Sequence, residues 1–178
     1  GGSARMGGAD KALAKIGGAR LVDLVIARLA SQVDRLLISG NSDYESGLKV
    51  VPDTTQVPKG PAGGVISIAR YLAAETPAQT GFITAPVDGP FFPEDLVVRL
   101  SAYGTSAIAG HGQETHPTFA YWTVDAVMQA ASEARSGLSL KRLAELSGAR
   151  VVRWERAAVF ANINTPEAQK ALQKASTP

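Results

Sequence analysis

The sequence predicts an α/β fold in which helices flank both faces of a mostly parallel, doubly wound sheet. Short apolar runs at 36–38 and 49–51 are typical of buried strands, because residues that favour turns close each of them. The segment 20–33 carries its apolar residues at helical spacing. Strands and helices at such distances predict parallel strands joined by right-handed crossovers. The 178 residues suit a single domain that buries its own core.

Composition excludes several classes of function. The chain has 18 basic and 16 acidic residues, and the basic ones are scattered, so we expect no nucleic-acid partner. It has no cysteine, which excludes a disulfide framework and thiolate chemistry. We see no signal peptide and no apolar run long enough to span a bilayer. We expect a cytoplasmic protein with no membrane partner, and a monomer.

The first eleven residues form a glycine-rich loop that contains Arg5 and Lys11. Glycine lets backbone amides approach an anion closely, and the two cations would surround a triphosphate. The loop is neither a Walker loop nor a dinucleotide fingerprint. A disordered tail is the alternative, but the loop continues into an apolar series at Leu13, Ile16 and Leu21. A doubly wound domain normally begins with a strand that delivers such a loop, so we expect one before Gly1.

Polar residues follow the first two predicted strands at the carboxyl edge of the sheet, where open α/β folds bind ligands. These residues are Asn41 and Asp53. Both residue types also favour turns through their own side-chain hydrogen bonds, which is the alternative interpretation. The next candidate is the glycine turn 60–64, which precedes a helix at 65–72. Such a turn presents free amides at the positive end of a helix dipole, although it also suits an ordinary loop.

Asp88 is the candidate metal ligand. It follows a strand predicted at 81–85, and Pro86, Gly89 and Pro90 stiffen its turn. Mg²⁺ takes hard oxygen ligands, typically one or two carboxylates together with phosphate oxygens. A turn or helix-cap role for Asp88 is the alternative.

The second half of the chain continues the alternation. We expect strands at 106–110, 118–122 and 150–154, and helices at 93–100, 124–133 and 138–146. A polar loop at 111–117 holds both histidines of the chain, and it lacks the further ligands that zinc requires. Asn162 and Asn164 share one face of an extended segment, and a last helix would begin near Thr165.

Four stretches resemble a known family in the same order along the chain. Residues 1–11 read Gly-Gly-Ser-Ala-Arg-Met-Gly-Gly-Ala-Asp-Lys, similar to the signature of nucleotidyltransferases related to molybdenum cofactor guanylyltransferase. The other three are Gly-Pro-Ala-Gly-Gly at 60–64, Pro-Val-Asp-Gly-Pro-Phe at 86–91 and Asn-Ile-Asn-Thr-Pro-Glu at 162–167. There are two departures: two residues instead of three separate Gly2 from Arg5, and the glycine turn is smaller than usual.

The resemblance implies a Rossmann-like fold of the nucleotide-diphospho-sugar transferase type and transfer of GMP from GTP to molybdopterin, with Mg²⁺ as cofactor. It implies protein partners among the enzymes that make or receive the molybdenum cofactor. Its catalytic residues would be Arg5, Lys11 and Asp88, with Asp88 as the metal ligand. The nucleotide would contact Gly1, Gly2, Lys11, Asn41, Asp53, Gly63 and Asp88, and the second substrate would contact His116, Asn162 and Asn164.

Three other functions remain open from the sequence. A related enzyme would use CTP on molybdopterin, or a nucleoside triphosphate on a sugar or alcohol phosphate, although the Asp-Lys pair after a double glycine favours the guanylyl branch. A non-catalytic nucleotide sensor would be expected to lose the metal aspartate, and Asp88 is present. A flavodoxin-like or dehydrogenase domain would bind a redox cofactor, but the dinucleotide fingerprint is missing.

Overall fold

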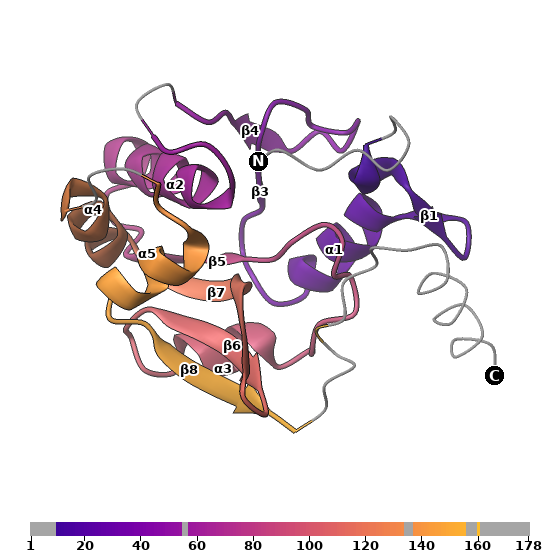
Figure 1. Ribbon diagram of the computed structural model, residues 1–178. Helices are drawn as coiled ribbons and strands as arrows, with labels where there is room; N and C mark the ends of the chain where they lie inside the picture. The colour runs from indigo at the N-terminus through magenta and orange to yellow at the C-terminus, as the bar shows by residue number, and fades with distance from the viewer. Residues whose placement is uncertain (1–9, 55–56, 134–136, 156–159, 161–178) are drawn as a thin grey trace.

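The computed structural model describes residues 10–54, 57–133, 137–155 and 160, and it has the α/β architecture that the sequence predicts (Figure 1). Its main sheet has the strand order β5-β7-β6-β8, formed by Gly81–Thr84, Glu114–Thr123, Ala107–His111 and Arg150–Trp154. β7 is antiparallel to both of its neighbours, whereas β6 and β8 are parallel. β5, β6 and β8 therefore run in one direction, and β7 alone reverses it.

Helices cover both faces of this sheet. On one face, α2 (Pro61–Glu75), α4 (Val124–Glu133) and α5 (Leu140–Leu146) pack together over Ile108, Ala120 and Trp122. On the other face, α1 (Leu21–Ala30) and α3 (Leu96–Ser101) pack over alternate residues of the same strands, such as Ala109 and Phe119. The alternation follows from the two-residue period of a strand, which sends neighbouring side chains to opposite faces.

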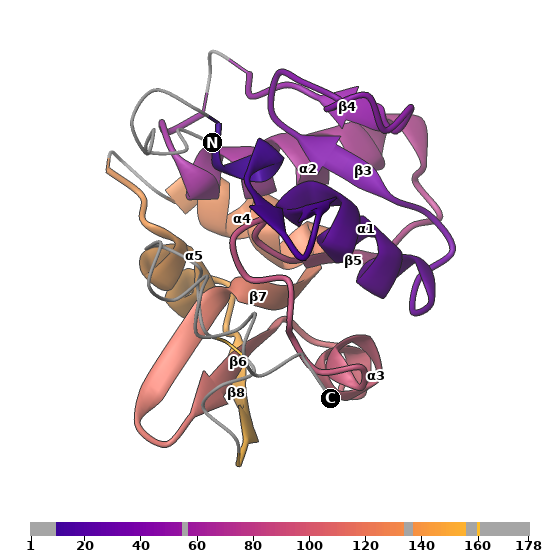
Figure 2. The same cartoon turned by 90° about the vertical axis from the view of Figure 1, so that its right-hand side faces the viewer.

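A second, parallel pair of strands lies at the far end of the molecule from β8 (Figures 1 and 2). It consists of β3 (Leu37–Ser39) and β4 (Lys49–Val51). Val51 packs with Ile68 and Leu72 of α2, and Phe82 of β5 lies against the same cluster. Helix α2 therefore contacts both sheets. Among the described strands, β3 pairs with β4 alone and β5 with β7 alone. The strand expected before Gly1 is not among them, and it stays a prediction.

Several elements have the bounds that the sequence predicts, among them β4, α4 and β8. Ser139 caps α5 as expected, because its hydroxyl accepts a hydrogen bond from the amide of Arg142 at 3.2 Å. The helix predicted at 93–100 begins three residues later, at Leu96. The carboxylate of Asp95 accepts a hydrogen bond from Trp154 Nε1 at 2.8 Å and does not cap the helix.

The prediction of a polar loop at 111–117 is wrong. Residues on both sides of Gly112 belong to β6 and β7, which form a tight hairpin, and Gly112 has a φ of 51° at its turn. The register between these strands shifts after Ile108, where Pro117 has no partner on β6. A bulge tolerates proline, because no ladder hydrogen bond is lost there. Both histidines consequently lie on strands.

The sequence analysis also missed the elements that lead into α1. A short 3₁₀ helix, η1 (Lys11–Leu13), is followed by a hairpin of β1 (Lys15–Ile16) and β2 (Ala19–Arg20). Gly17 and Gly18 form its turn with φ values of 57° and 88°, which suits the two-residue turns that join such strands. The last helix, expected from Thr165, lies outside the described residues. None of the helices within the described ranges is long and apolar enough to cross a membrane.

Candidate active site

The structure brings together Lys11 and Asp88, which are 77 residues apart in the sequence. Lys11 Nζ lies 3.8 Å from Asp88 Oδ2, and the two side chains are 17% and 21% exposed. This separation makes an ion pair, not a hydrogen bond. An ammonium group and a carboxylate thus share one partly buried site at the end of β5.

Local structure fixes each partner of this pair. Asp10 is the N-cap of η1, and its Oδ1 accepts a hydrogen bond from the amide of Ala12 at 3.0 Å, which places Lys11 in the first turn. Asp88 lies in the turn after β5, where the amide of Gly89 donates to the carbonyl of Pro86 at 3.3 Å. Gly89 is buried, so this turn is packed against the protein.

The carboxyl ends of β3 and β4 meet the first turn of α2. A Cβ atom added to Gly64 would lie 2.6 Å from Ser39 Oγ and 3.5 Å from Asp53 Oδ1. Beside them, the amide of Thr54 donates to the buried hydroxyl of Ser67 at 3.1 Å. Asp53 and the glycine turn, predicted separately as nucleotide contacts, are therefore neighbours. Asn41 is exposed on the loop that follows β3.

Packing alone accounts for the glycine at position 63. Gly63 is buried, and a Cβ atom there would overlap the carbonyl oxygen of Pro58 and approach Val57 Cγ2 to 3.1 Å. The close approach of the preceding loop thus requires a residue without a side chain. Contact between Gly63 and a nucleotide stays a prediction.

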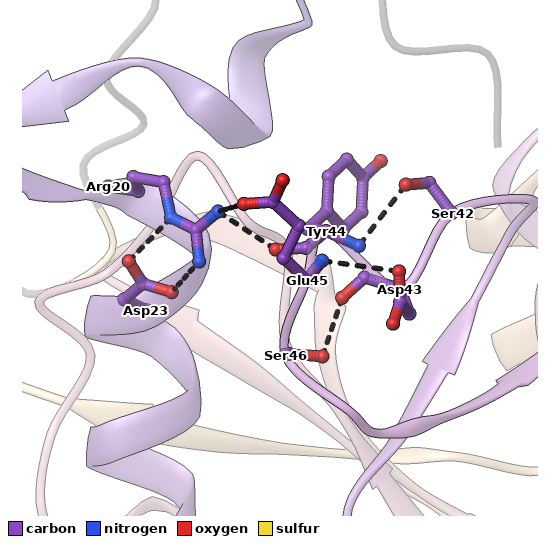
Figure 3. A network of polar contacts seen from close by, with 7 residues as sticks. All are labelled: Arg20, Asp23, Ser42, Asp43, Tyr44, Glu45 and Ser46. Carbon is purple, nitrogen blue, oxygen red and sulfur yellow. Dashed lines mark hydrogen bonds and ion pairs between the residues drawn. The ribbon is translucent and has the colours of Figure 1, made fainter.

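Residues that the sequence analysis missed hold the loop between β3 and β4 (Figure 3). Arg20 donates to both carboxylate oxygens of Asp23, at 2.7 and 2.8 Å, and from Nη1 to the carbonyl of Tyr44 at 2.8 Å. The Tyr44 hydroxyl lies 3.1 Å from Asp10 Oδ2. No local sequence pattern indicates contacts across 24 and 34 residues, so this network appears only in the structure.

His116, the predicted contact of the second substrate, lies in β7 and stacks on Phe160 with a centroid distance of 5.0 Å. Burial lowers the pKa of its imidazole below the ordinary 6.5. The carboxylate of Glu114 opposes this shift of the pKa, and the neighbouring His111 adds to it. His116 is therefore neutral at pH 7 and has one ring N–H to donate.

A separate hollow of about 580 Å³ lies between α1 and the segment that follows Asp88. Arg28 is one of the residues that line it. Its Nε donates a hydrogen bond to the carbonyl of Phe92, and its Nη2 forms an ion pair with Glu94 at 3.8 Å. None of the predicted site residues lines this hollow, so it gives no support to the nucleotide site.

Five predicted site residues lie outside the described ranges: Gly1, Gly2, Arg5, Asn162 and Asn164. Within those ranges, no group of three or more His, Cys, Asp or Glu side chains could hold a metal ion. Mg²⁺ binding at Asp88 stays a prediction.

Comparison with protein families and known sequences identifies relatives of the chain. Residues 1–162 match the model of the MobA-like NTP transferase domain. A molybdenum cofactor guanylyltransferase of Cereibacter sphaeroides is 39% identical over 174 residues, which cover 92% of this chain and 86% of the relative. Another, from Rhodopseudomonas palustris, is 40% identical over 129 residues, 67% of this chain and 60% of the relative.

Solved structures share the fold. A molybdopterin-guanine dinucleotide biosynthesis protein A from Archaeoglobus fulgidus superposes with a TM-score of 0.68 at 20% identity, covering 98% of this chain and 94% of its own. A 2-C-methyl-D-erythritol 4-phosphate cytidylyltransferase from Thermus thermophilus gives a TM-score of 0.63 at 18% identity, with 93% of each chain covered. At these identities the likeness concerns the fold alone.

The packing at Gly63 predicts that alanine there is more harmful than alanine at the next position. Gly63→Ala must displace a backbone carbonyl, and we expect it to lower the free energy of unfolding by about 1–3 kcal/mol. Gly64→Ala is the matched control, because the Ser39 hydroxyl can rotate away and alanine favours the helix. Urea unfolding of both variants measures the difference, and equal losses would contradict this packing.

The environment of His116 predicts a titration midpoint below 6.5, measured by NMR on its ring protons. The chain has two histidines, so His111→Gln assigns the signals. Because the unfolded chain binds this proton more readily, His116 should also reduce stability as the pH falls below about 6.5. A midpoint at or above 6.5 would show that the ring is not desolvated as described.

Proposed function

The chain belongs to the MobA-like NTP transferase family, and we propose that it transfers GMP from GTP to molybdopterin and releases pyrophosphate. The Lys11–Asp88 ion pair carries this proposal, because a cation and a carboxylate at one strand end suit a triphosphate bound with a metal ion. The relatives named molybdenum cofactor guanylyltransferase support guanine as the base and the molybdenum cofactor as the acceptor.

Phosphate binding would rest on the N-terminal loop and Lys11. Backbone amides of Gly1 and Gly2 would cradle the phosphates, and Arg5 and Lys11 would neutralise their charge. Lys11 is held in the first turn of η1 and is only 17% exposed, so its ammonium group acts in a partly desolvated site. A charge fixed in such a site stabilises a transferring phosphoryl group more strongly than a charge in water.

Asp88 would hold the Mg²⁺ ion. Its carboxylate is partly buried, lies in a packed turn and is 3.8 Å from the ammonium group of Lys11. This donor set fits an ion that takes one carboxylate from the protein and phosphate oxygens from the substrate. Mg²⁺ would supply positive charge beside the α-phosphate.

The reaction needs positioning more than covalent chemistry from the protein. A terminal phosphate oxygen of molybdopterin forms a bond to the α-phosphorus of GTP, and the bond from that phosphorus to the bridging oxygen breaks. Pyrophosphate leaves with the electron pair. Because the attacking oxygen is already an anion, no general base is required. The described part of the site places a cation and a carboxylate together.

The second substrate would contact His116, Asn162 and Asn164. His116 supports this part of the proposal, since it is half-buried, neutral at pH 7 and stacked on Phe160. A neutral imidazole can donate a hydrogen bond to a pterin without adding charge. Enzymes that use molybdopterin before or after this reaction would be the protein partners, and a monomer would suffice for transfer.

The competing nucleotide is CTP, because a cytidylyltransferase shares this fold. The glycine turn, which is smaller than usual in the family, leaves base selectivity to experiment. Calorimetric titration with GTP, CTP, ATP and UTP, each with and without Mg²⁺, decides between them. Selective CTP binding would assign the chain to the cytidylyl branch, and no nucleotide binding at all would overturn the proposal.

Asp88→Asn tests the proposed metal ligand. It keeps the size of the side chain and removes the charge, so we expect loss of the Mg²⁺-dependent part of GTP binding and a fall in transfer rate of at least about 100-fold. Asp34→Asn is the control, because Asp34 is exposed in the connection between α1 and β3. A variant at position 88 that retains Mg²⁺-dependent binding would exclude Asp88 as the ligand.

A further inference from the structure

The loop between β3 and β4 holds two adjacent residues in an unusual backbone conformation. Tyr44 and Glu45 have φ values of 53° and 60°, the left-handed region that residues with side chains rarely adopt. Such residues cost of order 1–3 kcal/mol each and persist only where their surroundings impose them. The cause of this conformation should therefore be found in the contacts of the loop.

Those contacts are partly local and partly with Arg20, the last residue of β2 (Figure 3). The amide of Tyr44 donates to Ser42 Oγ at 3.1 Å, and the amide of Glu45 donates to Asp43 Oδ1 at 3.2 Å. Arg20, which precedes α1, holds the Tyr44 carbonyl at 2.8 Å. Asp23 orients the Arg20 guanidinium through two hydrogen bonds, so the carbonyl is held by a fixed group.

The side chain of Tyr44 leads from this loop to the candidate active site. Its hydroxyl donates to Asp10 Oδ2 at 3.1 Å, while Asp10 Oδ1 caps η1 through the amide of Ala12. Burial raises the pKa of the Tyr44 hydroxyl, and the Asp10 charge raises it further, so the hydroxyl stays protonated and can donate at neutral pH. Both oxygens of Asp10 are thereby occupied, and the next residue is Lys11.

We propose that Tyr44 is a positioning residue that acts through Asp10 to hold Lys11 beside Asp88. The inference rests on the proposed function, in which Lys11 neutralises phosphate charge. Arg20 holds the conformation of the loop, and the loop positions the Tyr44 hydroxyl. The hydroxyl in turn holds the carboxylate of Asp10, the N-cap of η1. A residue 33 positions after Lys11 thus determines where the ammonium group lies.

Tyr44→Phe tests this role, with Tyr71→Phe as the matched control. Both variants lose one tyrosine hydroxyl in a hydrogen bond, since Tyr71 accepts from Arg35 at 2.9 Å on the surface of α2. We expect Tyr44→Phe to lower kcat/KM for GTP about tenfold, the effect of one hydrogen bond to a charged group. The KM for molybdopterin should not change. A general loss of folding would instead change the kinetic parameters for both substrates and lower the melting temperature.

A second measurement does not depend on the enzymatic activity. Amine labelling followed by mass spectrometry reports how fast Lys11 reacts in the substrate-free protein, with the exposed Lys59 as internal reference. Tyr44→Phe should increase the labelling rate of Lys11 and leave that of Lys59 unchanged. If the protein proves inactive with GTP but shows this increase, the proposed function fails and the positioning role stands.

A double-variant cycle tests whether Tyr44 acts through Asp10. If it does, Tyr44→Phe combined with Asp10→Asn should be no worse for GTP kinetics than Asp10→Asn alone. Additive effects would overturn the proposed route through Asp10. Labelling and kinetics for Tyr44→Phe that match those of Tyr71→Phe would overturn the positioning role altogether.

Discussion

The candidate site depends on one electrostatic contact, the ion pair between Lys11 and Asp88. The two residues come from elements far apart in the sequence, the 3₁₀ turn that begins the described chain and the turn that follows β5. Each side chain is mostly withdrawn from water, so each charge needs a partner of opposite sign. A magnesium–triphosphate complex would offer both kinds of partner, a cation to the carboxylate and anionic oxygens to the ammonium group.

Helix α2 places Asp53 and Gly63 relative to this pair. It packs against β3 and β4 through Val51, Ile68 and Leu72, and against the main sheet through a second cluster that includes Ile66 and Trp122. The glycines in its first turn carry no side chain, so Pro58, Ser39 and Asp53 can pack closely against the helix backbone. The strand ends that carry the predicted nucleotide contacts are therefore fixed to the same helix that supports β5.

The sequence predicted those parts of the fold whose signals are local. An apolar run closed by a proline located β4, an alternating pattern located β8, and a strand followed by a rigid turn located Asp88. The strand character of residues 111–117 was missed because a solvent-facing hairpin is polar, and the bulge at Pro117 has no local signature. The contact of Tyr44 with Asp10 spans 34 residues and depends on the tertiary arrangement, which no periodicity reveals.

The most direct test of this account is crystallography of the protein with GTP and Mn²⁺ in place of Mg²⁺, using the anomalous signal of manganese to locate the ion. The account predicts a manganese peak at coordination distance from the Asp88 carboxylate, with the phosphates of GTP beside Lys11. A nucleotide bound away from this pair, or a metal ion held without Asp88, would contradict it.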